Sequence, residues 1–224
     1  MGRLVDARIA ALGGSGGAGG QGGGGAAPAG DDALSAVVRA HFKTGGITRD
    51  QLVAHAFLLL VAGNATVASM VNLGTFELLT RPDQLAALKE EPALLPAAVE
   101  EMCRYHTASA LALRRVAVKD ADVGVTPVKA GEGLIALNMS ANRDAAVFED
   151  PETFNIRRPL KPNIAYGSGV HECIARGLSM AELEAAFGGL LTRLPGLRLA
   201  VPPAEVQWSE AARDVGLAAL PVTW

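Results

Sequence analysis

Residues 165–176, Ala-Tyr-Gly-Ser-Gly-Val-His-Glu-Cys-Ile-Ala-Arg, place one cysteine after a glycine-rich turn and before a helical pattern. Gly167 and Gly169 lack a Cβ, so the backbone there can take positive φ and can lie flat against a large planar group. Apolar residues recur at helical spacing from Ile174 onward, which predicts that Cys173 lies at or just before a helix N-terminus. Unpaired N–H groups and the helix dipole stabilise a thiolate there. A structural cysteine in a tight turn is the alternative.

The order of residue types over residues 166–175 resembles the haem-binding loop of the cytochromes P-450, Phe-Gly-x-Gly-x-His-x-Cys-x-Gly or Ala, with Tyr in place of Phe. The resemblance implies that Cys173 is the proximal ligand of the iron, onto which a thiolate pushes electron density. It also implies that Gly167 and Gly169 make room for the porphyrin, and that His171 contacts a haem propionate. The expected cofactor is therefore haem b, iron protoporphyrin IX.

Length, charge and cysteine content restrict the class of protein. The chain has 224 residues, of which 50% are apolar, a net charge of −3 and two cysteines. These values predict a soluble globular domain with enough apolar material for a core. Basic residues occur at most in pairs, which argues against a nucleic-acid partner. Two cysteines in a chain of this length favour an intracellular protein, cytoplasmic or mitochondrial, over a disulfide framework.

The N-terminal region differs from the rest in composition. Residues 13–30 are a glycine-rich tract, which predicts a flexible linker within an N-terminal segment at residues 1–30. The tract contains chance matches to dinucleotide-binding and hydrolase patterns, but no apolar strand precedes them. We expect residues 31–224 to form a partial cytochrome P-450 haem domain.

One long helix is predicted at residues 48–79. Thr48 and Gln51 form a capping box, and the next proline is Pro82. The centre of the helix, residues 56–63, is apolar on every face, so it must be buried or lie in a membrane. Polar residues interrupt the pattern too often for a span of about 20 apolar residues. We therefore predict a core helix and no membrane span.

Ala62-Gly63-Asn64-Ala65-Thr66 in this helix resembles the distal helix of the same family, which crosses the open face of the haem. The resemblance implies that Ala62 and Gly63 lie against the cofactor and that Thr66 takes part in catalysis. A threonine in a helix can also bond back to the carbonyl one turn earlier, and that alternative stays open. Ala65 replaces the acid that takes part in proton delivery to bound oxygen in oxygen-activating members.

The stretches at residues 56–66 and 105–115 are very similar to the fungal-type nitric oxide reductases of the superfamily. The resemblance implies that two NO molecules are converted to N2O, with NADH or NADPH as the direct electron donor and no obligatory redox partner. It further implies that Arg115 pairs with a propionate, and that Ser109 and Asp214 share a proton path. Ser109 as a turn hydroxyl and Asp214 as a cap of a backbone N–H are the alternatives.

Glu101 and Arg104 are three residues apart, so they lie on one helix face and can form an ion pair. An exposed pair of this kind is common and contributes little. The two residues also match the family's Glu-x-x-Arg motif, which locks the core near the proximal loop, and Arg157 is expected to join them. Cys103, inside the same helix, is predicted to be a small core residue.

The expected fold class is mainly α with small β-sheets, corresponding to the C-terminal half of the cytochrome P-450 fold. Short β-type runs at residues 116–137 predict a small sheet, and residues 197–224 predict a hairpin. The resemblance lacks the helices that close the other side of the haem pocket. Two alternatives to a nitric oxide reductase therefore stay open: a monooxygenase that uses O2, with an organic small-molecule substrate, and a truncated fragment without catalysis.

Overall fold

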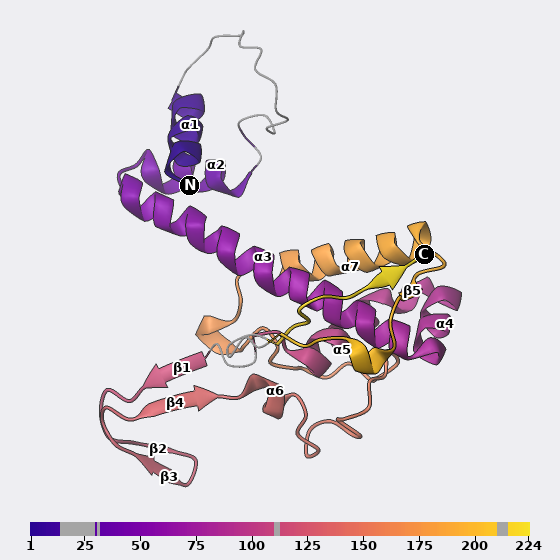
Figure 1. Ribbon diagram of the computed structural model, residues 1–224. Coiled ribbons are helices and arrows are strands. Elements are labelled where there is room, and N and C mark those ends of the chain that lie inside the picture. Colours follow the sequence, from indigo (N-terminus) through magenta and orange to yellow (C-terminus); the bar gives the residue numbers. More distant parts are fainter. Residues whose placement is uncertain (14–29, 31, 110–112, 210–214) are drawn as a thin grey trace. The chain divides into compact units, whose positions relative to one another are not determined.

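The computed structural model describes residues 1–13, 30, 32–109, 113–209 and 215–224 (Figure 1). Its elements in chain order are α1 (Gly2–Gly13), α2 (Ala33–Val37), the π-helix η1 (Val38–Phe42), α3 (Arg49–Thr80), α4 (Pro82–Glu90), the 3-10 turn η2 (Pro92–Leu94), α5 (Leu95–His106), β1 (Leu113–Val116), β2 (Ala121–Val123), β3 (Thr126–Val128), β4 (Gly133–Ala136), α6 (Asn138–Ala141), η3 (Gly169–His171), α7 (Arg176–Arg193), β5 (Arg198–Leu199), η4 (Pro203–Glu205) and β6 (Val222–Thr223). The fold is therefore mainly α with small β-sheets, as the sequence predicts. Most of the predicted glycine-rich linker lies outside the described residues.

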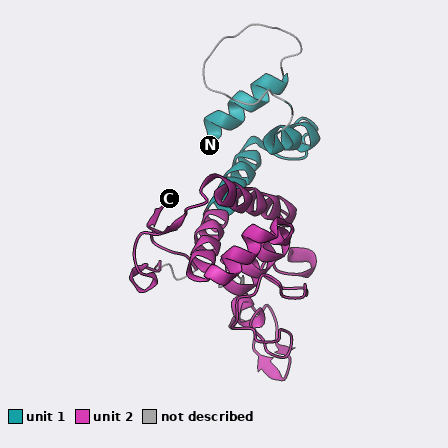
Figure 2. Ribbon diagram, turned by 90° about the vertical axis from the view of Figure 1, so that its right-hand side faces the viewer, with its two compact units in different colours: residues 1–64 teal, residues 65–224 magenta. Residues whose placement is uncertain are grey.

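The chain divides into two compact units, residues 1–64 and residues 65–224 (Figure 2). The first unit has a small apolar core in which Val5 of α1, Val38 of η1 and Leu52 of α3 are buried. Asp32 caps α2, because its side chain accepts a hydrogen bond from the Ser35 N–H at 2.9 Å. Helix α1 is absent from the sequence-based predictions.

Helix α3 begins where its capping box predicts. The Thr48 N–H donates to Gln51 Oε1 at 2.8 Å, and the Gln51 N–H donates to Thr48 Oγ1 at 3.2 Å. The helix then runs from Arg49 to Thr80, just before Pro82, which opens α4 at its first position. The prediction of one long helix is confirmed.

The two halves of α3 differ in burial. In the second half, residues 65–80, Met70, Leu73 and Leu78 are buried in the core of the second unit. In the first half, residues 49–64, five successive side chains of the apolar centre are exposed: Phe57, Leu58, Leu59, Leu60 and Val61. The prediction of a buried centre is therefore wrong for this stretch, because the core of the first unit reaches along α3 only to Ala56. By length and composition alone, α3 could also cross a membrane.

The core of the second unit forms where α3, α5 and α7 meet. Val99 and Met102 of α5 and Leu183 and Phe187 of α7 are buried there. Gly74 of α3 permits the close packing, since a Cβ at this position would lie 2.5 Å from Phe187 Cζ and 2.6 Å from Met102 Sδ. This core supports the loop that precedes α7.

Short antiparallel strand pairs complete the described part of the second unit. β1 pairs with β4, and β2 pairs with β3. β5 pairs with β6, so the predicted hairpin at the C-terminal end is confirmed. The short strands predicted at residues 116–137 are confirmed, but they form two separate two-stranded sheets instead of one, and β1 begins three residues earlier than the sequence suggests.

Candidate functional site

The loop before α7 is a tight turn that carries Cys173. Gly167 has a φ of 76° and Gly169 a φ of 68°, so both occupy the left-handed region that the sequence predicts. The Cys173 N–H donates to the Tyr166 carbonyl at 2.9 Å and closes the turn. Helix α7 begins at Arg176, whose N–H donates to the Cys173 carbonyl at 3.2 Å. Cys173 therefore lies just before the helix N-terminus, as predicted.

Cys173 is an exposed free thiol, whereas Cys103 is a buried free thiol. The apolar neighbours of Cys173 are also exposed: Val170 by 97%, Ile174 by 94% and Leu178 by 63%. Exposed apolar side chains that cluster in this way mark a binding site more often than scattered ones do. A tight structural turn around a buried cysteine, the alternative reading, does not describe this loop.

The residues present fit a haem. A haem offers three features to a protein: a flat apolar ring, an iron that can bind a thiolate, and two carboxylates on the propionate groups. The loop offers a thiol beside exposed apolar side chains, and a Cβ at Gly169 would have no heavy atom within 4 Å, so the backbone there faces open space. His171 of η3 and Arg115 of β1 are exposed, and both side chains have N–H groups that can donate to a carboxylate.

The roles predicted for Ala62, Gly63 and Thr66 of α3, which are contact with haem and catalysis, stay predictions. Ala62 and Gly63 are exposed, and a Cβ at Gly63 would meet no heavy atom within 4 Å. Among the described atoms, nothing therefore requires a glycine at this position. Thr66 is half-buried.

Two segments that carry the predicted proton-path residues Thr66 and Ser109 come together with residues 215 and 216 in the second unit. The Val215 N–H donates to the Ala108 carbonyl at 2.9 Å, which places the segment of Ser109 beside residues 215 and 216. A Cβ at Gly216 would lie 2.8 Å from Ser69 Oγ, so the turn of α3 that follows Thr66 is also adjacent. Asp214 lies outside the described residues.

Ser69 in this corner is a residue that sequence reasoning missed as a site candidate. It lies one helical turn after Thr66, and this spacing is the one feature of the sequence that points to Ser69 as a site residue. A helical serine carries no further mark of function in the sequence.

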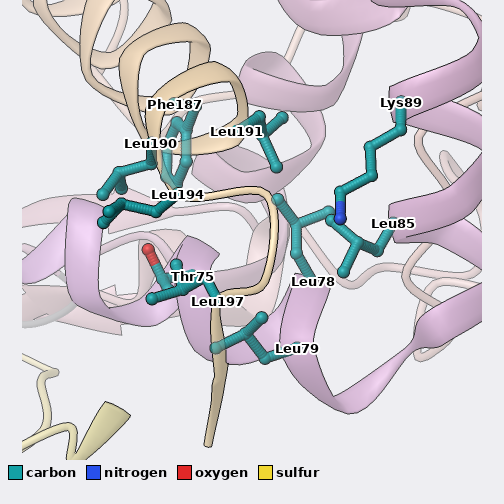
Figure 3. A pocket seen from close by; sticks show the side chains of 10 residues that line it. All are labelled: Thr75, Leu78, Leu79, Leu85, Lys89, Phe187, Leu190, Leu191, Leu194 and Leu197. Atoms are coloured by element: carbon teal, nitrogen blue, oxygen red, sulfur yellow. The ribbon is translucent and has the colours of Figure 1, made fainter. Parts of the chain in front are cut away.

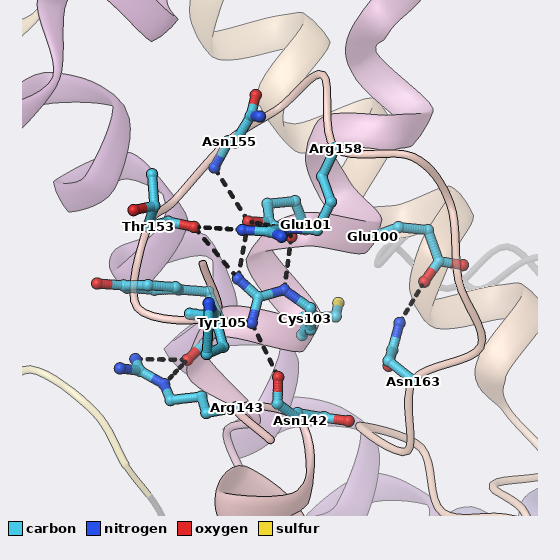
Figure 4. A network of polar contacts seen from close by, with 12 residues as sticks. Glu100, Glu101, Cys103, Tyr105, Asn142, Arg143, Thr153, Asn155, Arg158 and Asn163 are labelled. Carbon is cyan, nitrogen blue, oxygen red and sulfur yellow. Dashed lines mark hydrogen bonds and ion pairs between the residues drawn. The ribbon is translucent and has the colours of Figure 1, made fainter. Parts of the chain in front are cut away.

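Glu101 and Arg104 of α5 form a buried ion pair, and Figure 4 shows the network of polar contacts around Glu101. Arg104 Nε donates to Glu101 Oε2 at 2.7 Å and a second guanidinium nitrogen donates to Glu101 Oε1 at 2.8 Å. Arg104 also donates to the Asn142 carbonyl at 2.8 Å, and the Asn155 N–H donates to Glu101 at 3.0 Å. The predicted pair is confirmed. It is buried and makes further hydrogen bonds to the backbone, whereas the helical spacing alone is also compatible with an exposed pair.

Arg158, and not Arg157, joins this network. Arg158 Nε lies 3.2 Å from each oxygen of Glu101, whereas Arg157 pairs with Glu91 at 2.8 Å. The prediction of Arg157 is therefore wrong. The segment is an irregular turn, so neighbouring side chains leave it in different directions and the sequence gives no period from which to choose between them.

The adjacent face of α5 contacts the loop itself. Glu100 accepts hydrogen bonds from Asn163 at 3.1 Å and from Arg176 at 2.9 Å. One turn later, Cys103 Sγ lies 3.6 Å from the Tyr166 hydroxyl. Burial raises the pKa of the Cys103 thiol to about 11 and also raises the pKa of the Tyr166 phenol, so both are protonated near neutral pH. Cys103 is a buried residue, as predicted.

His106, at the end of α5, was not singled out by the sequence. Its Nε2 lies 2.9 Å from Glu77 Oε1 of α3, and Glu77 also contacts Arg81. Burial, followed by the charges of Arg143 and Arg81, lowers the pKa of His106 to about 3. The ring is therefore neutral and serves the core.

An apolar pocket between α3, α4 and α7 is too small for a substrate (Figure 3). Leucines line most of it, and Lys89 at its rim donates to the Pro195 carbonyl at 2.9 Å. The cavity volume is about 20 Å³, room for roughly one water molecule. Small-molecule pockets are more than ten times larger.

Comparison with known proteins identifies the family of the chain. The family model for cytochrome P-450 matches residues 30–205. Cytochrome P-450 55A3 of Fusarium lichenicola is 44% identical over 196 residues, which cover 87% of this chain and 48% of that protein. Vitamin D3 dihydroxylase of Streptomyces griseolus is 41% identical over 195 residues, again 87% of this chain and 48% of that protein.

A solved structure gives the same result. The complex of Streptomyces peucetius CYP105P2 with a biphenyl compound superposes with a TM-score of 0.86 at 38% identity, over 100% of this chain and 52% of that chain. The chain therefore spans about half the length of its relatives. Since the matched region includes the Cys173 loop, the α5 ion pair and α3, the chain belongs to the cytochrome P-450 family, whose members carry haem.

Proposed function

We propose that the chain provides the cysteine-bearing part of a haem monooxygenase. Such an enzyme transfers one oxygen atom of O2 to a small organic molecule and reduces the other to water with two electrons from NADH or NADPH. The observation that carries the proposal is the exposed thiol of Cys173 on a glycine turn with exposed apolar neighbours. Relatives of similar identity named Vitamin D3 dihydroxylase and Nocardicin C N-oxygenase support oxygen transfer as the reaction. Haem, when bound, supplies the activation of oxygen.

The residues of the loop and of β1 would hold the cofactor. Cys173 would bind the iron through its sulfur, and the N-terminus of α7 that follows would favour a negative charge there. Val170 and Ile174 would cover apolar surface of the ring and keep water from the site. Arg115 and His171 would pair with the propionates, a task for which the planar fork of an arginine is well suited.

Hydroxyl groups would carry protons to the reacting face. Thr66 lies on α3 one turn before Ser69, and Ser109 lies beside residue 215 in the same corner. Each hydroxyl can accept one proton and donate another, which a relay requires. Asp214 stays part of this path as a prediction, and electrons come from NADH or NADPH.

A nitric oxide reductase is the second candidate, favoured by Ala65. A proton relay for oxygen activation gains from a carboxyl group next to Thr66, and alanine offers none. The relative from Fusarium lichenicola is as similar as any of the oxygenases named above. In this reading, NADH or NADPH donates two electrons directly, and two NO molecules with two protons give N2O and water.

Product analysis of the haem-loaded protein separates the candidates. One reaction contains vitamin D3 as the probe, ¹⁸O2 and NADPH with a reductase. The other contains NO and NADH without oxygen. The proposal expects labelled oxygen in the sterol product, with none from Cys173→Ala. Production of N2O in the second reaction alone would replace the proposal with the second candidate, and no product in either would favour a chain without catalysis.

A further inference from the structure

Tyr166 lies at the centre of the contacts between the Cys173 loop and the helices beneath it. Its carbonyl accepts the Cys173 N–H at 2.9 Å. Its hydroxyl lies 3.0 Å from Ser179 Oγ of α7 and 3.6 Å from Cys103 Sγ of α5. A phenylalanine in this position could fill the same space but could make neither hydroxyl contact.

The partners of the Tyr166 hydroxyl are fixed groups. Cys103 is 2% exposed within the core, and Ser179 lies in the first turn of α7, where its N–H donates to the Ala175 carbonyl at 2.8 Å. The Arg176 guanidinium carbon lies 5.9 Å from the centroid of the Tyr166 ring and so packs near it. Cys103 and Ser179 therefore contact the hydroxyl of Tyr166, and Arg176 lies near its ring.

The loop needs such an anchor. With Gly167 and Gly169 in the left-handed region, it has a large conformational entropy to lose on ordering. Val170 and Ile174 contribute little to holding it, because they are 97% and 94% exposed. Fixing the side chain of Tyr166 also fixes its carbonyl, and with it the Cys173 backbone.

We propose that the Tyr166 hydroxyl is a positioning group for Cys173: bonded to Ser179 and Cys103, it fixes the turn whose carbonyl holds the Cys173 N–H. The inference deepens the proposed function, on which its consequence for haem rests. The anchoring itself requires no cofactor. Tyr166 does not touch the reacting atoms, and it acts through the Cys173 backbone.

The first test uses the full chain without haem. Hydrogen exchange of the Cys173 amide and iodoacetamide labelling of its thiol are compared for the wild type, Tyr166→Phe and Ser179→Ala. We expect exchange to rise about fivefold in either variant, the effect of one hydrogen bond. The double variant should add little, because both changes remove the same bond. Amide exchange at Met102 in the core reports global loosening and should not change.

The control is Tyr105→Phe, the same chemical change at a residue whose hydroxyl donates to the Glu152 carbonyl at 3.3 Å on another part of the unit. This control should leave the Cys173 amide unaffected. Unchanged exchange in Tyr166→Phe, or an equal rise in Tyr105→Phe, would overturn the proposal.

The second test uses the haem-loaded protein. We expect Tyr166→Phe to raise the fraction of reduced, carbon-monoxide-bound protein that lacks the red-shifted thiolate Soret band, while Tyr105→Phe keeps the wild-type fraction. If the wild type binds no haem but the exchange result holds, the proposed function fails and the anchoring stands. If Tyr166→Phe raises exchange of the Cys173 amide but leaves the Soret band unchanged, the anchoring stands and its proposed effect on the binding of Cys173 to haem iron is wrong.

Discussion

The two halves of α3 have similar apolar sequences and opposite environments. In the first half, Phe57 and Leu60 are each 58% exposed, whereas Leu73 in the second half is fully buried. Both halves are helical, so local pattern is sufficient to form the helix. Burial differs because Met70, Leu73 and Leu78 of the second half lie in the core of the second unit, whereas the core of the first unit reaches along α3 only to Ala56. An apolar sequence thus predicts which helix surface is suited to burial, and tertiary packing decides whether that surface is buried.

The largest effect should come from removing a buried leucine of the second half. Leu73→Ala leaves a cavity in the core and should lower the free energy of unfolding by about 2–5 kcal/mol. Leu60→Ala, the same change in the first half, should alter it by no more than about 0.5 kcal/mol. Chemical denaturation of both variants measures the difference. Equal losses would mean that the first half is also packed in solution.

Two glycines sharpen the comparison with changes of opposite sign. Gly74→Ala places a methyl group against Phe187 and Met102 and should destabilise the protein by about 1–3 kcal/mol. Gly63→Ala meets open space and removes a poor helix former, so it should stabilise α3 by up to about 1 kcal/mol. Thermal unfolding of the pair is the measurement, and a loss of stability in Gly63→Ala would contradict the exposure of the first half.

The third effect is a pH dependence of the free energy of unfolding. It arises from His106 of α5, which lies against Glu77 in the second half of α3. Because the folded pKa of His106 is about 3, below the unfolded value of 6.5, the unfolded chain binds the extra proton between these values. Stability should therefore fall as pH decreases through this window, by at most about 1.4 kcal/mol per pH unit from this group. His106→Asn should show a shallower decrease in denaturation curves at pH 6 and pH 5. Parallel decreases in both proteins would contradict the neutral buried ring.

Sequence reasoning located the parts of the site that carry a local signal. The Thr48 and Gln51 capping box fixes the start of α3, and the glycines before Cys173 permit the positive φ that the structure has. The Glu101 and Arg104 pair follows from helical spacing. Each of these features depends on residues within a few positions of one another.

The features that sequence reasoning missed depend on distant parts of the chain. The choice of Arg158 over Arg157 is made in an irregular turn, and Ser69 meets Gly216 across about 150 residues. The Tyr166 hydroxyl finds its partners on two different helices. The exposure of Phe57 follows from which elements pack nearby. None of these has a period or motif that a sequence could reveal.

The central claim is that the sulfur of Cys173 binds haem iron, and the absorption spectrum of the reduced, carbon-monoxide-bound protein tests it most directly. The account predicts a red-shifted thiolate Soret band in the haem-loaded wild type and in Cys103→Ala, and its loss in Cys173→Ala. A band that persists in Cys173→Ala, or a folded wild type that holds haem without the band, would contradict the account.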